Sequence, residues 1–290
     1  MPWHLLGAGN LGTLAAFYFG QAGLTVRLAG RTATRRRLTL PDGTVHDLQL
    51  AGDDNAPITH LVLATKAAQS LDALTPLRAR LSAGTTLIRL QNGLGSLDGL
   101  PPPSPHIIEA VANSGAWREA LPGGGEHVHL AAENPTLFGD GHATPPDWFA
   151  PLACHWPQLH WRTDIHLQQW LKLSVNAIIN PLTALHDCDN GALLTNTALH
   201  PRLHALAAEV DQVASQLLPD WPGDTAGRAL ALARATATNT SSMRADVRAG
   251  RVTEIDFING YLLRAATQLA LPLPAHSHII AAIKALPQKR

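Results

Sequence analysis

A glycine-rich turn at the start of the chain constrains the fold more than any other feature of the sequence. An apolar run at residues 3–6 leads directly into Gly7-Ala8-Gly9-Asn10-Leu11-Gly12, a helical pattern continues to residue 20, and a second apolar run follows at 24–29. This order predicts a βαβ unit that binds a dinucleotide through residues 7–12, because N–H groups that open a helix can bind a pyrophosphate. The glycine spacing alone is weak evidence, since glycines also mark ordinary turns. The strand before it and the helix after it carry the prediction.

The end of the second apolar run indicates which dinucleotide binds. Units that bind NAD usually carry Asp or Glu at this position, where the carboxylate accepts hydrogen bonds from the ribose 2′-OH. Arg31 stands here instead, and Arg35, Arg36 and Arg37 follow it. A guanidinium can bind a 2′-phosphate through paired hydrogen bonds, whereas a carboxylate would repel it, so we predict NADPH rather than NADH. The alternative is a basic turn that only faces water.

Further apolar runs predict the strands and helices in the rest of the chain. Patterns typical of strands span residues 58–64, 86–90, 107–110 and 127–131. After a stretch rich in Pro and Trp, helical patterns continue from residue 165 to the C-terminus. We therefore predict an α/β protein in which an N-terminal Rossmann-type dinucleotide-binding domain, residues 1–163, is followed by an all-helical C-terminal domain, residues 164–290.

The charge balance argues against nucleic acid and membranes as partners. Lys plus Arg equals Asp plus Glu at 22 each, and only 15% of the residues are charged, so no broad basic surface is expected. The chain contains neither a signal-peptide pattern nor an apolar run of about 18 residues. We expect a small-molecule ligand and a cytoplasmic location.

Cysteine and histidine usage predicts no metal site. The two cysteines, Cys154 and Cys188, form no C-x-x-C pair, which argues against a disulfide framework and a zinc site. The 15 histidines are scattered, and we expect most of them at the surface or in packing roles. A homodimer is consistent with the apolar helix faces, but such faces serve cores and interfaces equally well, so the subunit number stays open.

Lysine is rare enough in this chain that each internal lysine needs a reason. Of the 22 Lys and Arg residues, four are lysines, and two of these lie close to the C-terminus. A partly desolvated lysine can act as a general acid near neutral pH, which arginine cannot. Lys66 ends a predicted strand, and Lys172 lies in the first long helical pattern of the second domain.

Lys172, Asn176 and Asn180 recur every fourth residue, so they share one face of that predicted helix. The alternative to a functional stripe is a face that is simply solvated. We favour a functional stripe because Asn is a poor helix former and the stripe ends at Pro181, which frees backbone groups.

Glu254 and Ser242 each allow two interpretations. Thr253 with Asp256 three residues later resembles a capping arrangement, which would make Glu254 an ordinary first-turn acid. Ser242 could similarly be only a helix cap. The spacing leaves both cases open.

Longer motifs resemble those of the ketopantoate reductases, also called 2-dehydropantoate 2-reductases, over nearly the whole chain. Besides the glycine turn, the matching segments are Thr65-Lys66-Ala67-Ala68-Gln69, Gln91-Asn92-Gly93-Leu94-Gly95, and residues 172–176, 180–184, 241–243 and 253–260. The resemblance implies a Rossmann domain joined to a helical domain. It also implies NADPH as cofactor and reduction of 2-dehydropantoate to pantoate on the route to pantothenate and coenzyme A.

The resemblance also implies roles for individual residues. Lys172 matches the family's general acid, and Glu254 matches the acid that helps to hold the substrate. The expected substrate contacts are Asn92, Asn176, Asn180, Asn239 and Ser242. The expected cofactor contacts beyond the glycine turn and Arg31 are Lys66, Gln69 and Asn92.

Two departures from the family pattern bear on substrate preference. Ala68 stands where the family often has an aromatic residue, and the segment 112–115 is altered. A reductase of another 2-keto acid or of an imine is therefore one alternative. A non-catalytic NADPH-sensing protein is the other, although the complete Lys, Asn, Ser and Glu set counts against it.

Overall fold

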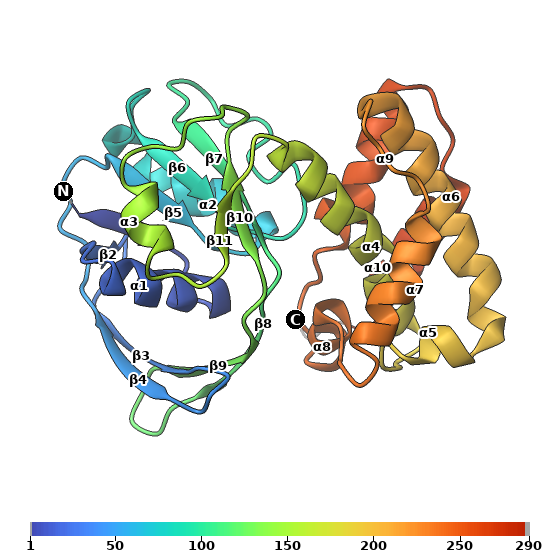
Figure 1. Cartoon of the computed structure of the whole chain (residues 1–290), viewed down its shortest axis with the longest axis horizontal. Helices are drawn as coiled ribbons and strands as arrows, with labels where there is room; N and C mark the ends of the chain where they lie inside the picture. Colours follow the sequence, from blue (N-terminus) through green and yellow to red (C-terminus); the bar gives the residue numbers. More distant parts are fainter. Residues whose placement is uncertain (1, 288–290) are drawn as a thin grey trace. The chain divides into compact units, whose positions relative to one another are not determined.

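The computed structural model describes residues 2–287 and forms two compact units (Figure 1). The first unit contains the chain up to Gln91 together with Ser96–His166. The second contains Asn92–Gly95 and the chain from Leu167 onward. The division after His166 lies close to the boundary predicted near residue 163. The sequence does not predict that Asn92–Gly95, which come from the first half of the chain, belong to the helical unit.

A mostly parallel seven-stranded sheet forms the centre of the first unit, in the order β11-β10-β7-β6-β5-β1-β2. Only the pair β7 and β10 is antiparallel. The strands are β1 (Trp3–Leu6), β2 (Val26–Leu28), β5 (His60–Leu63), β6 (Thr86–Arg89), β7 (His106–Ala112), β10 (Thr136–Gly139) and β11 (Leu159–Trp161). The strands predicted from the runs at 3–6, 24–29, 58–64, 86–90 and 107–110 are confirmed, since each coincides with one of these elements.

A second sheet of four strands has the order β4-β3-β9-β8. Its strands are β3 (Thr34–Thr39), β4 (Val45–Leu50), β8 (Gly115–Ala120) and β9 (Glu126–Ala132). Of these strands, the sequence analysis predicts only β9. The strand β3 contains three consecutive arginines, and β8 has mostly exposed side chains, so neither carries the apolar signal of a buried strand.

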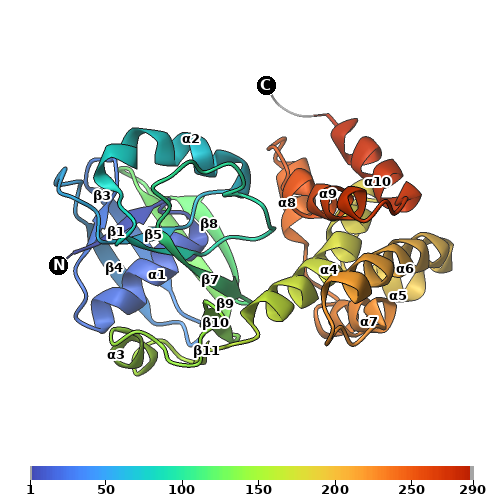
Figure 2. The same cartoon turned by 90° about the horizontal axis from the view of Figure 1, so that it is seen from above.

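Helices cover both faces of the seven-stranded sheet. Helix α1 (Asn10–Gln21) is buried along Gly12–Phe19, and it shares one apolar core with both sheets. The other face packs against α2 (Ser70–Leu74) and the 3-10 helix η2 (Thr75–Arg80) in a separate core. Figure 2 shows α1 and α2 on opposite sides of the sheet. The remaining elements of this unit are η1 (Ala67–Gln69) and α3 (Phe149–Ala153).

The described part of the second unit consists of helices and the loops that join them, and contains no strand. Its first and longest helix, α4 (Ile165–Leu185), contributes to both of the unit's apolar cores. The others are α5 (Ala192–Thr195), η3 (Thr197–Leu199), α6 (His200–Leu217), α7 (Thr225–Ala235), α8 (Ser242–Arg248), η4 (Ile255–Phe257), α9 (Asn259–Gln268) and α10 (Pro274–Lys284). The first unit is thus a Rossmann-type α/β domain and the second an all-helical domain, which confirms the predicted fold class.

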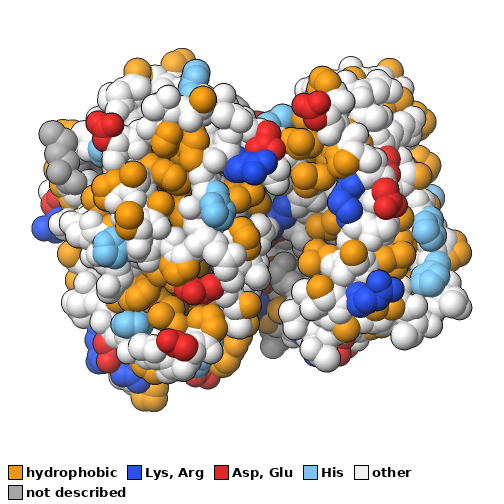
Figure 3. Space-filling view, viewed as in Figure 1, with side chains coloured by type: hydrophobic (Ala, Val, Ile, Leu, Met, Phe, Trp, Pro, Cys, Tyr) orange, Lys and Arg blue, Asp and Glu red, His pale blue; other side chains and the backbone are white. Residues whose placement is uncertain are grey.

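Charged side chains show no strong grouping on the one face of the molecule that Figure 3 draws. On the face drawn in Figure 3, acidic and basic side chains are scattered and form no broad patch of one sign among the described residues. Within residues 2–287, no helix has the length and apolar character needed to cross a membrane. Cys154 and Cys188 are both free thiols.

Candidate active site

The glycine turn between β1 and α1 depends on its glycines at two positions. Gly7 has φ +101°, and a Cβ there would lie 2.5 Å from the backbone nitrogen of Thr65. A Cβ at Gly12 would lie 1.9 Å from the carbonyl oxygen of Gly7. Both positions therefore require the absence of a side chain, and β1, the turn and the end of β5 can pack closely.

The start of α1 presents backbone N–H groups that no side chain caps. Gly9 is the N-cap residue, and the first helical hydrogen bond runs from the Thr13 N–H to the Gly9 carbonyl. The N–H groups of a helix's first turn have no partner inside the helix, and they carry the positive end of its dipole. The Asn10 side chain donates to the Ala116 carbonyl at 2.7 Å, which leaves the backbone rather than this amide to bind an anion.

Two arginines lie beside the glycine turn. The Arg36 Nε donates to the Ala8 carbonyl at 3.0 Å, and Arg118 reaches from β8 so that its NH1 lies 3.0 Å from where a Gly9 Cβ would be. Glu126 pairs with both guanidinium groups at 3.3 Å. Burial lowers the pKa of Arg36, Glu126 opposes this, and the charges of Arg118 and Arg31 lower it further. Arg118 lies on β8, which has no apolar pattern, so the sequence alone does not indicate its role.

The other predicted basic residues have different surroundings. Arg31 is exposed at the end of β2, where it was expected. Arg35 and Arg37 lie on β3 rather than in a turn, and Arg37 forms a two-point ion pair with Asp47 at 2.8 and 3.1 Å. Of the three consecutive arginines, only Arg36 therefore contacts the glycine turn.

An acid that the sequence analysis did not anticipate also lies at the end of β2. The Gly30 N–H donates to Asp53 at 2.5 Å. Arg80 binds the same carboxylate through two nitrogens at 2.7 and 2.8 Å, and it holds the pKa of Asp53 well below its usual range. The negative charge of Asp53 is thus balanced by Arg80, and the exposed Arg31 remains the cation that follows β2.

The buried side-chain amide of Gln91 holds the turn that carries Lys66 and Gln69 through hydrogen bonds. Gln91, just after β6, donates to the Thr65 carbonyl at 2.7 Å and to the Ser70 hydroxyl at 2.7 Å, and it accepts from the Ser96 hydroxyl at 2.7 Å. Lys66 is half-buried at the start of η1, and Gln69 is exposed. The network fixes the backbone on both sides of these two candidate cofactor contacts.

In the helical unit, Lys172 and Asn92 meet directly. The Lys172 Nζ donates to the Asn92 Oδ1 at 2.7 Å. Burial lowers the pKa of Lys172 to about 8, and the negative charge of Glu254 partly opposes this shift. Lys172 can therefore exchange a proton close to neutral pH.

The segment Asn92–Gly95 is fixed against η4, next to Glu254. The Leu94 N–H donates to the Phe257 carbonyl at 2.8 Å. Gly93 has φ +76°, and a Cβ there would lie 2.6 Å from the same carbonyl oxygen. Glu254 is the N-cap residue of η4 but makes no side-chain cap hydrogen bond, and the acid inside the first turn is Asp256. The turn at η4 thus carries Glu254, and its contacts with residues 93 and 94 keep the neighbouring Asn92 next to Lys172.

The stripe of polar residues on α4 is not a solvated face. Lys172 and Asn176 are half-buried, and Asn180 is only 6% exposed. The helix continues through Pro181, which cannot donate to the Ala177 carbonyl one turn earlier.

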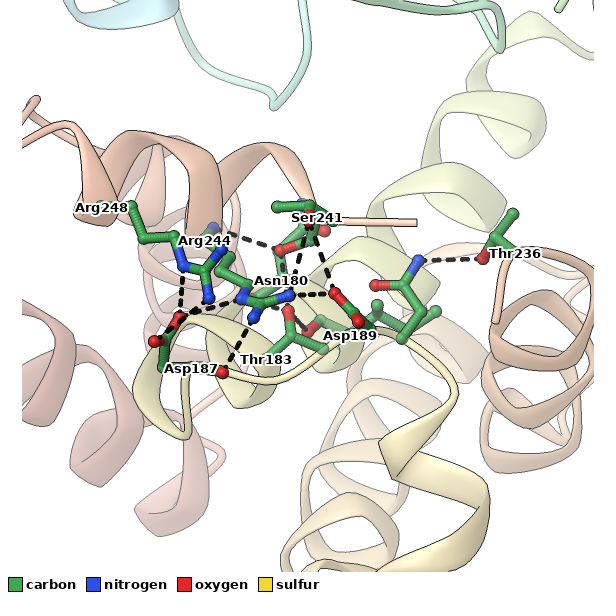
Figure 4. Close-up of polar contacts among 11 residues, drawn as sticks. Asn180, Thr183, Asp187, Asp189, Thr236, Ser241, Arg244 and Arg248 are labelled. Atoms are coloured by element: carbon green, nitrogen blue, oxygen red, sulfur yellow. Dashed lines mark hydrogen bonds and ion pairs between the residues drawn. The ribbon is translucent and has the colours of Figure 1, made fainter. Parts of the chain in front are cut away.

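A cluster of polar contacts fixes α8 against the end of α4 (Figure 4). The Ser241 hydroxyl lies 2.7 Å from that of Thr183 and accepts from the Arg244 N–H, so the cap of α8 is Ser241. The capping alternative for Ser242 is therefore wrong, and Ser242 is an exposed first residue of the helix. Arg244 pairs with the carboxylates of Asp187 and Asp189.

The sequence-predicted residues thus form two groups within the two units. Residues 7–12 and Arg31 lie at the carboxyl ends of β1 and β2, with Lys66 and Gln69 after β5. Lys172, Asn92 and Glu254 form one cluster in the helical unit, and Asn180 lies on the helix to which α8 and Ser242 are anchored. Asn239 is exposed, and its carbonyl accepts from the Asn190 N–H at 3.2 Å.

Comparisons with known proteins agree with this architecture. The family model described as ketopantoate reductase PanE/ApbA matches residues 3–142, and the model of that family's C-terminal domain matches residues 164–287. The chain belongs to the ketopantoate reductase family. Membership in this family makes it an oxidoreductase of a dinucleotide-dependent class.

Individual members of the ketopantoate reductase family and one other enzyme illustrate the similarity. The 2-dehydropantoate 2-reductase of Vibrio cholerae is 31% identical, with 98% of this chain and 97% of that protein covered. A dimeric ketopantoate reductase from Staphylococcus aureus has a TM-score of 0.85 at 22% identity, covering 99% of this chain and 98% of that one. A D-mandelate dehydrogenase in complex with NADH and anilino(oxo)acetate has a TM-score of 0.80 at 19% identity, with 98% of each chain covered. At these identities, the two solved structures demonstrate the shared fold.

Proposed function

We propose that this protein reduces 2-dehydropantoate to pantoate with NADPH, a step in pantothenate and coenzyme A biosynthesis. Family membership and similarity to curated 2-dehydropantoate 2-reductases support the substrate. The observation that carries the proposal is the half-buried Lys172 amine, which binds Asn92, lies near the charge of Glu254 and has a pKa lowered to about 8.

The residues around β1 and β2 have the chemistry needed to hold NADPH. The uncapped start of α1 and the turn at residues 7–12 suit the pyrophosphate, and Arg31 with Arg36 suits the 2′-phosphate. Lys66 and Gln69, on the turn that Gln91 braces, are further proposed contacts, as is Asn92. When bound, NADPH supplies the hydride that reduces the C2 ketone.

Lys172 is the proposed general acid. Charge develops on the ketone oxygen during reduction, and a neighbouring ammonium group can stabilise that charge and then donate a proton to the oxygen. A pKa of about 8 leaves Lys172 mostly protonated at neutral pH while making the proton easier to release. Asn92 orients the amine, and Glu254 helps to keep it protonated.

The amides and hydroxyl further along the helical unit are proposed to hold the substrate. Neither the Asn176 nor the Asn180 side chain hydrogen-bonds to another described residue, so both amides can bind a carboxylate or hydroxyl group. Ser242 and Asn239 are proposed as additional contacts. Fixing the two ends of the keto acid would place its carbonyl for reaction.

A substrate panel tests this proposal against its alternatives. We expect 2-dehydropantoate to support NADPH oxidation with a much higher kcat/KM than pyruvate or phenylglyoxylate, and NADPH to be preferred over NADH. A higher kcat/KM with another 2-keto acid or an imine would identify a different reductase of this family. Tight NADPH binding without turnover of any tested substrate would indicate an NADPH-sensing protein. Sedimentation of the same sample measures the subunit number, which the sequence leaves open between a monomer and a homodimer.

A further inference from the structure

One face of the four-stranded sheet brings together two histidines and a glutamate. His127 and His129 are two residues apart on β9, so their side chains point to the same side of the sheet. Glu119 on β8 is the direct cross-strand partner of His127. The strand around His127 is predicted from the sequence but the metal site is not, because Glu119 lies on β8, which has no apolar pattern.

The three side chains have the spacing of a metal site. Glu119 Oε1 lies 3.1 Å from His129 Nε2 and 3.6 Å from His127 Nδ1, and one ligand atom from each residue lies within 4.8 Å of the others. A tetrahedral ion with bonds of about 2.1 Å holds its ligand atoms about 3.4 Å apart. An ion could therefore bind all three groups with only small side-chain movements.

Neighbouring residues orient both imidazole rings. The Nε2 of His127 lies 2.7 Å from the Thr39 hydroxyl, so a proton on Nε2 leaves Nδ1 free as a ligand atom. The His129 ring stacks on Trp117 with centroids 3.8 Å apart and an angle of 8° between the planes. A hydrogen bond from the ring nitrogen that does not bind the metal, as His127 can make to Thr39, is typical of metal-binding histidines.

The surrounding charges also permit a cation. Arg37, the cross-strand neighbour of His127 on β3, is paired with Asp47 through two hydrogen bonds, so its positive charge is compensated locally. Glu119 contributes a negative charge to the candidate site. Two imidazole nitrogens and one carboxylate oxygen suit zinc-like divalent transition metals, with the remaining position open to water.

A second group with metal-ligand spacing lacks these properties. His4, Asp53 and Asp54 also lie within 4.8 Å of one another. However, Arg80 already binds Asp53 at 2.7 Å and lies 3.9 Å from Asp54. The positive charge of the Arg80 side chain thus already lies between those two carboxylates. By contrast, no Lys or Arg within residues 2–287 forms an ion pair with Glu119.

We propose that Glu119, His127 and His129 form a binding site for one zinc-like divalent ion on the exposed face of β8 and β9. This site is separate from the glycine turn, and the inference does not rest on the proposed reductase activity. The ion would link two neighbouring strands of the second sheet, so its expected role is structural.

Calorimetric titration of ZnCl₂ into metal-free protein without an affinity tag tests the site. We expect one equivalent of Zn²⁺ to bind to the wild type. Because even changes outside the ligand set cost roughly 10- to 100-fold in metal affinity, His129→Gln and Glu119→Gln should weaken binding at least this much. His278→Gln, which replaces an exposed histidine on α10, is the matched control and should bind like the wild type.

Two further measurements separate loss of a ligand from loss of folding. One equivalent of Co²⁺ should give the visible absorption of a tetrahedral site in the wild type and in His278→Gln, but not in His129→Gln. Zn²⁺ should raise the Tm of the wild type and leave that of His129→Gln unchanged, although both unfold cooperatively without metal. Absence of Zn²⁺ binding by the wild type, or unchanged affinity in both ligand variants, would overturn the proposal.

Discussion

The side-chain amide of Asn259 donates a 2.7 Å hydrogen bond to the backbone carbonyl of Ala177. This is the carbonyl that Pro181, four residues further along α4, cannot satisfy. Asn259 is completely buried at the start of α9. A side chain from another helix thus replaces the hydrogen bond that the proline removes, between the turns that carry Asn176 and Asn180.

Asn259→Ala is expected to destabilise the protein by about 1–3 kcal/mol, because it leaves a buried carbonyl without a donor. Urea unfolding measures the change. Pro181→Ala restores a backbone N–H at the position that can bond to Ala177, so it should recover part of the loss in the Asn259→Ala background. Simple addition of the two single effects in the double variant would contradict the compensation described here.

Lys172→Ala is expected to lower kcat with 2-dehydropantoate by about 10²–10⁴-fold, the usual contribution of a general acid. NADPH affinity, measured by fluorescence titration, should change little. Lys284→Ala removes an exposed amine on α10, whose ion pair with Asp256 also lies at the surface, and it serves as the control. Turnover of Lys172→Ala near the wild-type rate would exclude this residue as the proton donor.

The pH profile should report the protonation of Lys172. A general acid must be protonated, so kcat should fall as the pH rises through the lowered pKa of about 8. The charge of Glu254 raises this pKa, and Glu254→Gln should therefore move the alkaline limb to lower pH. A limb that stays in place in Glu254→Gln would show that another group controls it.

Arg31→Ala should weaken NADPH binding selectively. A hydrogen bond to a charged group contributes about 1.5–3 kcal/mol, so KM for NADPH should rise roughly 10- to 100-fold while KM for NADH stays nearly constant. Arg35→Ala changes an exposed arginine on β3 and is the control. Equal losses with both cofactors would mean that Arg31 does not bind the 2′-phosphate.

The sequence predicts the buried parts of the fold well and the polar parts poorly. The strands β1, β2, β5, β6 and β7 of the large sheet lie in mostly apolar runs, and the glycine turn has a local steric cause, so these parts can be recognised from neighbouring residues. The short strands β10 and β11 of the same sheet are not predicted from the sequence. The strand that contains Arg35, Arg36 and Arg37 has no such pattern, because its stability comes from pairing with distant strands.

The site shows the same division. The rarity of lysine and the four-residue spacing along α4 draw attention to Lys172, Asn176 and Asn180 without any structure. The approach of Asp53 to Gly30, and of Arg118 to Gly9, depends on contacts between residues far apart in the sequence. No local pattern encodes such contacts, so only the folded chain reveals them.

The grouping of Asn92–Gly95 with the helices limits how the protein can be dissected. A fragment expressed from residue 167 onward would contain most of α4 and all the helices after it, yet it would lack Asn92, whose Oδ1 accepts a hydrogen bond from the Lys172 ammonium group. It would also expose the Phe257 carbonyl that Leu94 otherwise covers. Grafting or truncation experiments that treat the C-terminal half as self-sufficient would therefore remove part of the candidate catalytic cluster together with the discarded half.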